Sequence, residues 1–197
     1  MTGANPDAKS GKKAGPEQSL RSSLKAAIIP VTDFQQNCSL IWDEATKVGA
    51  VVDPGGDLDR IERGIAEAGI TVEKILLTHG HIDHAGGADE LRERLAVKIE
   101  GPHKADIILL EALQKQGKLY GISGVRDVTP DRWLDDGDIV SVAGHSFEIF
   151  HCPGHSPGSV VFFNRPQKFA LFDRESANSK IDRRPMLQQP ERFKQSY

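Results

Sequence analysis

Short apolar runs alternate with helical patterns in the first half of the chain. Runs typical of buried strands occur at 26–31, 38–42, 48–52 and 72–77. Between the last two runs, Leu58, Ile61 and Ile65 recur at helical spacing, which predicts a helix over 58–68 with Asp57 as its N-cap. Strands mixed with helices favour a layered α/β fold, with sheets inside and helices outside.

The pattern continues to residue 172. Helices are predicted over 88–96 and 102–116, followed by a long loop over 117–130. Further strands are predicted at 97–99, 139–143, 146–151, 160–163 and 169–172. We therefore expect one folded domain over 24–173.

Both ends of the chain differ in composition from this middle part. Residues 1–23 contain mainly Gly, Ala, Ser, Lys and Pro with one leucine, too little apolar surface to offset the entropy of ordering. We expect a disordered N-terminal tail there. Residues 174–197 show no hydrophobic period, and we expect an irregular or divergent C-terminal tail.

Composition excludes several classes of partner. The net charge of −3 gives no basic field for a nucleic acid, and no apolar run approaches the length of a membrane span. The two cysteines, Cys38 and Cys152, are far apart and form no disulfide framework or CxxC site. Free thiols fit a reducing compartment, so we expect a cytoplasmic protein; its oligomeric state stays open.

Four potential metal ligands lie close together after the strand at 72–77. They are His79, His81, Asp83 and His84, and they follow Thr78 directly. Imidazole and carboxylate are the ligands that zinc and similar divalent ions prefer. A tight loop at a strand end turns such side chains into one cleft, so we predict a metal site here rather than a polar surface loop.

A second loop carries a further histidine. Cys152-Pro153-Gly154-His155-Ser156-Pro157-Gly158 also follows a predicted strand, and its two Pro-Gly steps restrict the backbone. On its own it is also compatible with an ordinary turn that carries a solvent-facing histidine. Together with the first cluster, His155 becomes a candidate third imidazole for one metal.

These two motifs resemble the metallo-β-lactamase superfamily. Thr-His-x-His-x-Asp-His at 78–84, followed some 70 residues later by Pro-Gly-His-Ser-Pro-Gly, looks like its glyoxalase II (hydroxyacylglutathione hydrolase) branch. The segments 29–42, 52–56 and 129–138 are similar to small bacterial members of that branch, and the resemblance covers 25–172. It implies an αββα sandwich that is incomplete in its C-terminal half.

The resemblance also implies a role for each site residue. His79, His81 and His155 would bind one metal, and Asp83 and His84 a second. Asp173 matches the bridging aspartate, although Phe172 stands where the family has glycine. Asp53 would orient a ligand by hydrogen bonding, with a plain turn-forming role as the alternative.

The chemistry that the resemblance implies is metal-assisted thioester hydrolysis. The expected cofactor is Zn²⁺, one or two ions per chain, with iron or manganese as alternatives. A hydroxide held by the metals would attack a small-molecule thioester of the S-lactoylglutathione type, with Asp83 and His84 as catalytic residues. No protein nucleophile is needed, so Cys152 is read as a small buried apolar residue.

The chain departs from the family pattern near its end. No histidine follows His155, whereas longer relatives have a last histidine that completes the second metal site. We expect a truncated or frame-disrupted product, with a natural short variant as the other explanation. The first metal position is then expected to bind better than the second, with weak hydrolysis or none.

Two other functions stay open. His79, His155 and Asp173 could form the two-histidine, one-carboxylate face of a mononuclear iron persulfide dioxygenase. A degenerate, non-catalytic homologue that binds a metal or a partner is the third possibility. The remaining histidines, His103 and His145 and His151, are interpreted as polar surface or supporting residues.

Overall fold

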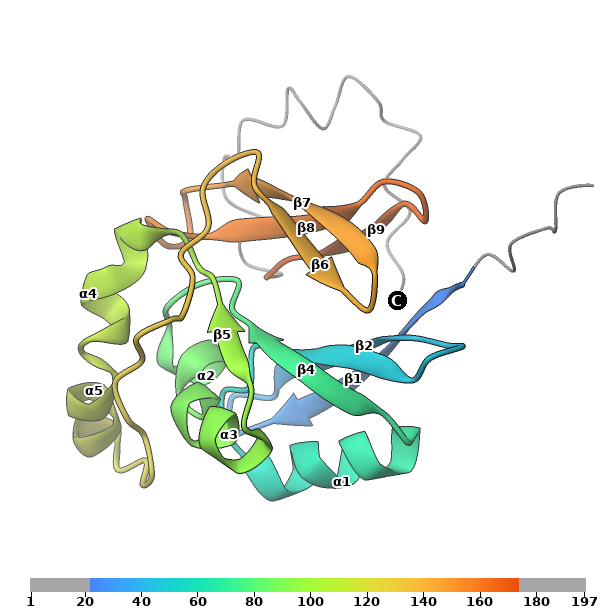
Figure 1. Cartoon of the computed structure of the whole chain (residues 1–197). Helices are drawn as coiled ribbons and strands as arrows, with labels where there is room; N and C mark the ends of the chain where they lie inside the picture. The colour runs from blue at the N-terminus through green and yellow to red at the C-terminus, as the bar shows by residue number, and fades with distance from the viewer. Residues whose placement is uncertain (1–21, 174–197) are drawn as a thin grey trace, which may run out of the picture.

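The computed structural model describes residues 22–173, and within them two β-sheets face each other (Figure 1). The first sheet has the order β1-β2-β3-β4-β5 and the second the order β6-β7-β8-β9. The strands are β1 (Leu24–Val31), β2 (Gln36–Asp43), β3 (Val48–Val52), β4 (Thr71–Leu76), β5 (Lys98–Glu100), β6 (Ile139–Val142), β7 (His145–His151), β8 (Val160–Asn164) and β9 (Phe169–Leu171). The predicted tails fall outside the described residues, except for Ser22 and Ser23.

The two sheets differ in strand direction. In the first sheet, β1 to β3 are antiparallel neighbours, whereas β3, β4 and β5 run parallel. The second sheet is antiparallel throughout. Parallel neighbours need a crossover, and helices supply it between β3 and β4 and between β4 and β5.

Helices cover the outer face of the first sheet (Figure 1). They are α1 (Leu58–Ala68), α2 (Ile82–Ala85), α3 (Ala88–Leu95), the 3₁₀ helix η1 (Lys104–Asp106), α4 (Ile107–Leu110) and α5 (Leu113–Tyr120). The described residues therefore form a helix layer, a first sheet and a second sheet, which are three layers of an αββα sandwich. The predicted α/β class is confirmed.

The central strands of the first sheet are buried on both faces. Leu40 of β2 packs toward the helices with Ile61 and Leu91, in one apolar cluster. Its neighbour Ile41 points the other way and packs with Phe147 and Phe162 of the second sheet. Burial on both faces explains why these strands appear in the sequence as continuous apolar runs.

One predicted helix is interrupted. The pattern over 102–116 predicts a continuous helix, but the chain forms η1, α4 and α5, and α5 continues to Tyr120. The Leu110 carbonyl accepts the Val128 N–H at 3.1 Å instead of the Gln114 N–H, which donates to Asp127 at 2.8 Å. These contacts with a distant segment replace a helical hydrogen bond and break the helix.

Asp57 occupies the predicted N-cap position, but its side chain does not cap the helix. Asp57 precedes α1 with a φ of 50°, and its side chain makes no capping hydrogen bond. Its carboxylate instead accepts the Thr32 N–H at 2.8 Å and so ties the turn between β1 and β2 to the start of α1.

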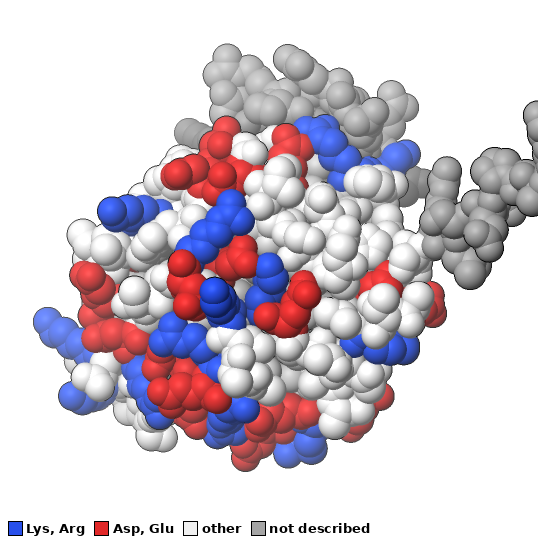
Figure 2. All heavy atoms as spheres, viewed as in Figure 1, with Lys and Arg blue, Asp and Glu red and all other residues white. Residues whose placement is uncertain are grey.

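The surface carries charges of both signs. On the face seen in Figure 2, acidic and basic side chains are interspersed over the helix layer. Arg94 illustrates the pattern, since it binds Asp59 and Glu62 of α1 and Glu90 of α3. Among residues 22–173, no helix is long and apolar enough to cross a membrane.

Candidate metal centre

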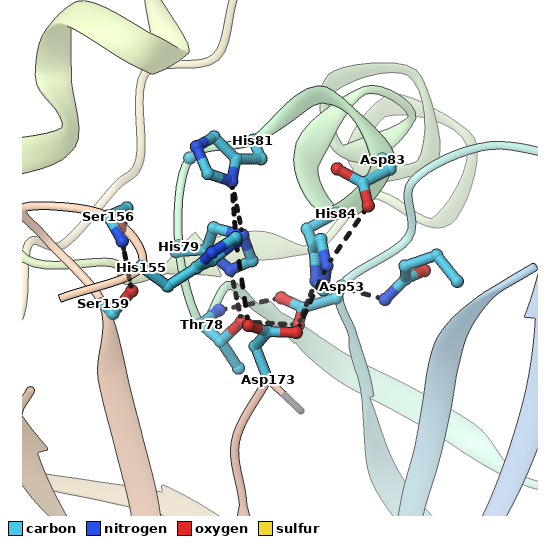
Figure 3. Close-up of polar contacts among 12 residues, drawn as sticks. Asp53, Thr78, His79, His81, Asp83, His84, His155, Ser156, Ser159 and Asp173 are labelled. Carbon is cyan, nitrogen blue, oxygen red and sulfur yellow. Dashed lines mark hydrogen bonds and ion pairs between the residues drawn. The ribbon is translucent and has the colours of Figure 1, made fainter. Parts of the chain in front are cut away.

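The site lies where loops from both sheets meet (Figure 3). The first sheet contributes Asp53 directly after β3 and the segment 78–84 after β4. The second sheet contributes His155 from the loop between β7 and β8, and Asp173 from the segment after β9. Strand ends at one edge of the sandwich thus bring residues together that are far apart in sequence.

Three imidazoles form the first group. His79 Nε2 lies 3.1 Å from His81 Nδ1, which lies 2.9 Å from His155 Nε2. The three nitrogens all lie within 4.8 Å of one another, a spacing at which they could hold a metal ion. Thr78 Oγ1 lies 3.1 Å from the other ring nitrogen of His79, so Nε2 faces the group.

The surroundings of His79 and His81 favour neutral imidazoles. Burial lowers the pKa of His79, and the neighbouring histidines His84, His81 and His155 lower it further. Burial also lowers the pKa of His81, with His155 as the next cause. A neutral imidazole keeps the lone pair that a metal ion needs, so both rings are suited to bind a cation.

His84 lies among carboxylates and forms the second group. Its Nδ1 lies 3.0 Å from Asp53 Oδ2, and its Nε2 lies 3.5 Å from Asp83 Oδ2 and 3.7 Å from Asp173 Oδ1. Burial lowers the pKa of His84, but the hydrogen bond and charge of Asp53, with the charges of Asp83 and Asp173, outweigh burial, so the pKa is raised.

Asp173 lies between the two groups. Its Oδ1 faces His84, while its Oδ2 is 3.8 Å from His155 Nε2 (Figure 3). The structure therefore brings all six predicted ligands to one place. Their assignment as ligands stays a prediction.

Asp53 is held firmly behind His84. Its Oδ1 accepts the Thr78 N–H at 2.8 Å, and its Oδ2 accepts the Thr78 hydroxyl at 2.6 Å. Its φ of 53° lies in the left-handed region, an unfavourable conformation that is typical of functional sites. Asp53 thus makes the contacts expected of an orienting residue, in addition to forming a turn.

The turn after Asp53 packs directly on the helix that carries Asp83 and His84. A Cβ on Gly55 would lie 1.5 Å from the Asp83 carbonyl oxygen, so only glycine fits there. Gly55 is therefore required for the close approach of α2.

Two residues near the site were not predicted from the sequence. Gln36, at the start of β2, places its Nε2 3.2 Å from His84 Nδ1. Asp106 is fully buried and contacts the backbone of both histidine loops. The sequence shows only that Asp106 is a carboxylate directly before the apolar run Ile107–Leu110. This position does not indicate which groups Asp106 would contact.

The other histidines have supporting contacts. His145 Nε2 lies 2.9 Å from Asp43 Oδ2. His103 stacks on His151 with ring centroids 3.8 Å apart, and His151 Nε2 donates to the Pro157 carbonyl at 2.9 Å. The last contact supports the loop that carries His155, in line with the prediction of supporting roles.

An open cleft of about 1340 Å³ adjoins the site. His81 and Asp83 form part of its wall, together with the aromatic residues Phe34 and Tyr120. Arg60 and Arg63 of α1, as well as several acidic residues, also line it. The cleft is therefore amphipathic and large enough for a small molecule.

Comparison with known proteins adds to this picture. Residues 31–171 match the model of the metallo-beta-lactamase superfamily. A hydroxyacylglutathione hydrolase, GloC, of Haemophilus influenzae is 44% identical over 149 residues, which cover 75% of this chain and 70% of that protein. A hydroxyacylglutathione hydrolase of Klebsiella pneumoniae is 30% identical over 142 residues, which cover 72% of this chain and 49% of that protein.

Solved structures agree with the fold. The crystal structure of the B3 metallo-beta-lactamase BLEG-1 is similar with a TM-score of 0.65 at 28% identity, and covers 76% of this chain and 74% of its own. The di-iron-bound form of TTHA1623 is similar with a TM-score of 0.62 at 27% identity, and covers 75% of this chain and 73% of its own.

Proposed function

The chain belongs to the metallo-β-lactamase superfamily as a glyoxalase II-like member, and we propose that it is a metal-dependent hydrolase of small-molecule thioesters. The family expected from the sequence motifs is confirmed by these matches. The activity is proposed because relatives named hydroxyacylglutathione hydrolase share the matched region. For the Klebsiella relative, this region is about half of the protein.

The observation that carries the proposal is the convergence of three imidazole nitrogens beside His84 and two carboxylates. His81 Nδ1 lies 3.1 Å from His79 Nε2 and 2.9 Å from His155 Nε2. Such a nitrogen and oxygen donor set fits a divalent metal ion. We propose zinc, since three imidazoles are a common zinc ligand set.

Two positions are proposed for the metal. His79, His81 and His155 would hold one ion, while Asp83, His84 and Asp173 would hold a second. A divalent ion in such a site supplies Lewis acidity, which polarises a carbonyl group and makes water more acidic. The first position is proposed to bind more tightly, because its three imidazole nitrogens all lie within 4.8 Å of one another.

The protein's own groups orient these side chains. Asp53 accepts from Thr78 and pairs with His84 Nδ1, which directs His84 Nε2 toward Asp83 and Asp173. Thr78 also contacts His79 Nδ1 and so fixes the second ring. This network sets ring orientation before any substrate arrives, which reduces the reorganisation needed for reaction.

The adjoining cleft suits a thioester with a polar, partly apolar thiol component. Phe34 and Tyr120 offer aromatic surface, and Arg60 and Arg63 offer positive charge for a carboxylate. We propose S-lactoylglutathione or a similar acyl-thiol as the substrate. Its leaving thiolate needs little acid assistance, because a thiol has a reference pKa of about 8.5. The cysteines are therefore assigned no part in the reaction.

Measurement of metal content and S-lactoylglutathione turnover on one purified sample tests the proposal. We expect bound zinc and release of glutathione that stops when a chelator removes the metal. Oxygen uptake with glutathione persulfide by an iron-loaded sample, without thioester turnover, would replace hydrolysis by the dioxygenase reaction. Metal binding with neither reaction would favour the non-catalytic alternative.

The proposed difference between the two positions has its own measurement. Titration with Zn²⁺ against a chelator is expected to show one tight equivalent and a weaker second one. Two equally tight equivalents would contradict it.

A cytoplasmic location is also proposed, because Cys38 and Cys152 are free thiols buried in the fold.

A further inference from the structure

Asp106 lies between the two loops that carry the histidines. Its carboxylate is fully buried, and it comes from η1, outside both loops. We propose that Asp106 is a positioning residue, which holds the two loops in register so that His81 and His155 face one metal ion. This inference rests on the metal centre proposed above, and it assigns Asp106 no contact with substrate.

Asp106 accepts three hydrogen bonds, from both loops. Its Oδ2 accepts the Gly80 N–H at 2.8 Å and the Ser156 hydroxyl at 2.7 Å. Its Oδ1 accepts the Gly158 N–H at 2.6 Å. Gly80 lies between His79 and His81, Ser156 follows His155 directly, and Gly158 ends the same loop three residues after His155, so Asp106 holds both histidine segments.

The glycines on either side show how closely the loops approach this residue. A Cβ on Gly158 would lie 2.6 Å from Asp106 Cγ, and a Cβ on Gly80 would lie 3.2 Å from Asp106 Cβ. The first distance is too short for any side chain, and the second is tight. Two glycines in separate loops are therefore packed closely against Asp106, Gly158 against its carboxylate carbon and Gly80 against its Cβ.

Other hydrogen bonds also hold the two loops. The Val160 N–H donates to the Thr78 carbonyl at 2.8 Å, where β8 begins and the first loop starts. The His103 N–H donates to the Gly158 carbonyl at 3.1 Å and brings η1 next to the second loop. Asp106 contacts both loops through one carboxylate, at Gly80 in the first loop and at Ser156 and Gly158 in the second.

Loss of this carboxylate should therefore separate the imidazoles. Replacement by asparagine keeps the size, but its amide NH₂ would face an N–H donor in at least one loop. The 2.9 Å distance between His81 Nδ1 and His155 Nε2 depends on both loops, so the first metal position should weaken. Groups that orient metal ligands typically contribute about 10–100-fold to metal affinity.

The experiment compares Asp106→Asn with Asp43→Asn in the full chain. Asp43 is a matched control, because it is also a buried carboxylate that accepts two backbone N–H groups and a hydroxyl, all from Ala45 and Thr46. Zn²⁺ affinity is measured by competition with a chelator, and the Co²⁺-loaded proteins are compared by visible absorption. Thermal unfolding of the metal-free proteins reports the loss of fold stability separately.

We expect Asp106→Asn to lower Zn²⁺ affinity about 10–100-fold and to change the Co²⁺ spectrum. Asp43→Asn should leave both unchanged, even if it lowers the melting temperature as much. Wild-type affinity in Asp106→Asn, or an equal loss in Asp43→Asn, would overturn the proposal. Absence of Zn²⁺ binding by the wild-type chain would instead overturn the metal centre itself.

A milder variant keeps the test decisive if Asp106→Asn does not fold. Ser156→Ala removes one of the three hydrogen bonds to Asp106 and creates no buried charge; because it also removes the 2.8 Å contact with Ser159 Oγ, Ser159→Ala is its control. We expect it to weaken Zn²⁺ binding about two- to tenfold. Unchanged affinity and an unchanged Co²⁺ spectrum in this variant would also overturn the role of Asp106.

Discussion

His155 Nε2 lies 2.9 Å from His81 Nδ1, although the two residues are 74 positions apart in the chain. His81 follows β4 of the first sheet, and His155 follows β7 of the second sheet. The contact therefore depends on the packing of one sheet on the other, and every residue that fixes either loop contributes to it.

The first prediction concerns His155 itself. His155→Ala should reduce Zn²⁺ affinity on the order of 100-fold or more, because it removes one of three converging nitrogens. Chelator competition measures the loss. His145→Ala is the control, since His145 pairs with Asp43 and takes no part in the cluster. An equal loss in both variants would contradict a ligand role for His155.

The second prediction concerns Asp53. Asp53→Asn keeps the shape of the side chain but should lower metal affinity or turnover by about 10–100-fold, because an amide no longer fixes the ring of His84. Asp57→Asn is a matched control, since Asp57 also has a left-handed φ and accepts a backbone N–H. Unchanged metal binding and kcat in Asp53→Asn would show that Asp53 only forms the turn and does not orient His84.

The third prediction is a pH dependence of stability. A hydrogen bond from His145, followed by one from the Thr46 N–H, lowers the pKa of Asp43 from its usual 3.8 to about 2. The folded chain therefore takes up this proton at a lower pH than the unfolded chain. The stabilisation is complete above about pH 4 and is lost as the pH falls toward 2.

Urea unfolding at several pH values measures this effect. The difference in the free energy of unfolding between the wild type and Asp43→Asn should be largest at neutral pH and shrink below pH 4. A difference that stays constant down to the acid limit of folding would show that the carboxylate charge contributes nothing.

The fourth prediction distinguishes a side chain that contacts the substrate in the cleft from one that only stabilises the core. Phe34 is 61% exposed and lines the cleft, whereas Phe162 is fully buried between the sheets. Phe34→Ala should raise KM for the thioester with little change in melting temperature. Phe162→Ala should lower the free energy of unfolding by about 3–5 kcal/mol, because it leaves a cavity in the core. An unchanged KM in Phe34→Ala would show that the substrate binds outside the cleft.

The fifth prediction concerns the cysteines. Burial raises the pKa of the Cys152 thiol to about 11, with a smaller effect from Asp136, and burial raises that of Cys38 well above its usual range. The thiolate is the reactive form, so both thiols should react slowly with a disulfide reagent at neutral pH until the chain is unfolded. Cys152→Ala should retain thioester turnover; loss of turnover without loss of metal would implicate the thiol.

Much of the fold could be predicted from local patterns. The apolar runs at 38–42 and 48–52 correspond to β2 and β3, and the helical spacing at 58–68 gives α1 exactly as predicted. Five of the six potential ligands were identified because imidazoles and a carboxylate cluster in two short motifs, whereas Asp173 was identified only through the family resemblance. These features are encoded by neighbours in sequence, which is why the sequence alone was sufficient.

What could not be predicted depends on contacts between distant segments. The break between α4 and α5 arises because Leu110 and Gln114 bond to residues 127–128 instead of to each other. Asp57 bonds to Thr32 rather than capping its helix. Asp106 shows the same limitation, since its partners Gly80 and Gly158 lie in two other parts of the chain.

Because the candidate ligands come from loops of both sheets, ion binding is coupled to the packing of one sheet on the other. An ion held by His79 and His155 would link the sheets only when they are packed together, so the packed state would bind it and the unfolded chain would bind it less. Free Zn²⁺ at about 100 times its Kd would then add about 2.7 kcal/mol to stability. The apparent melting temperature of this protein becomes a measure of the metal available around it.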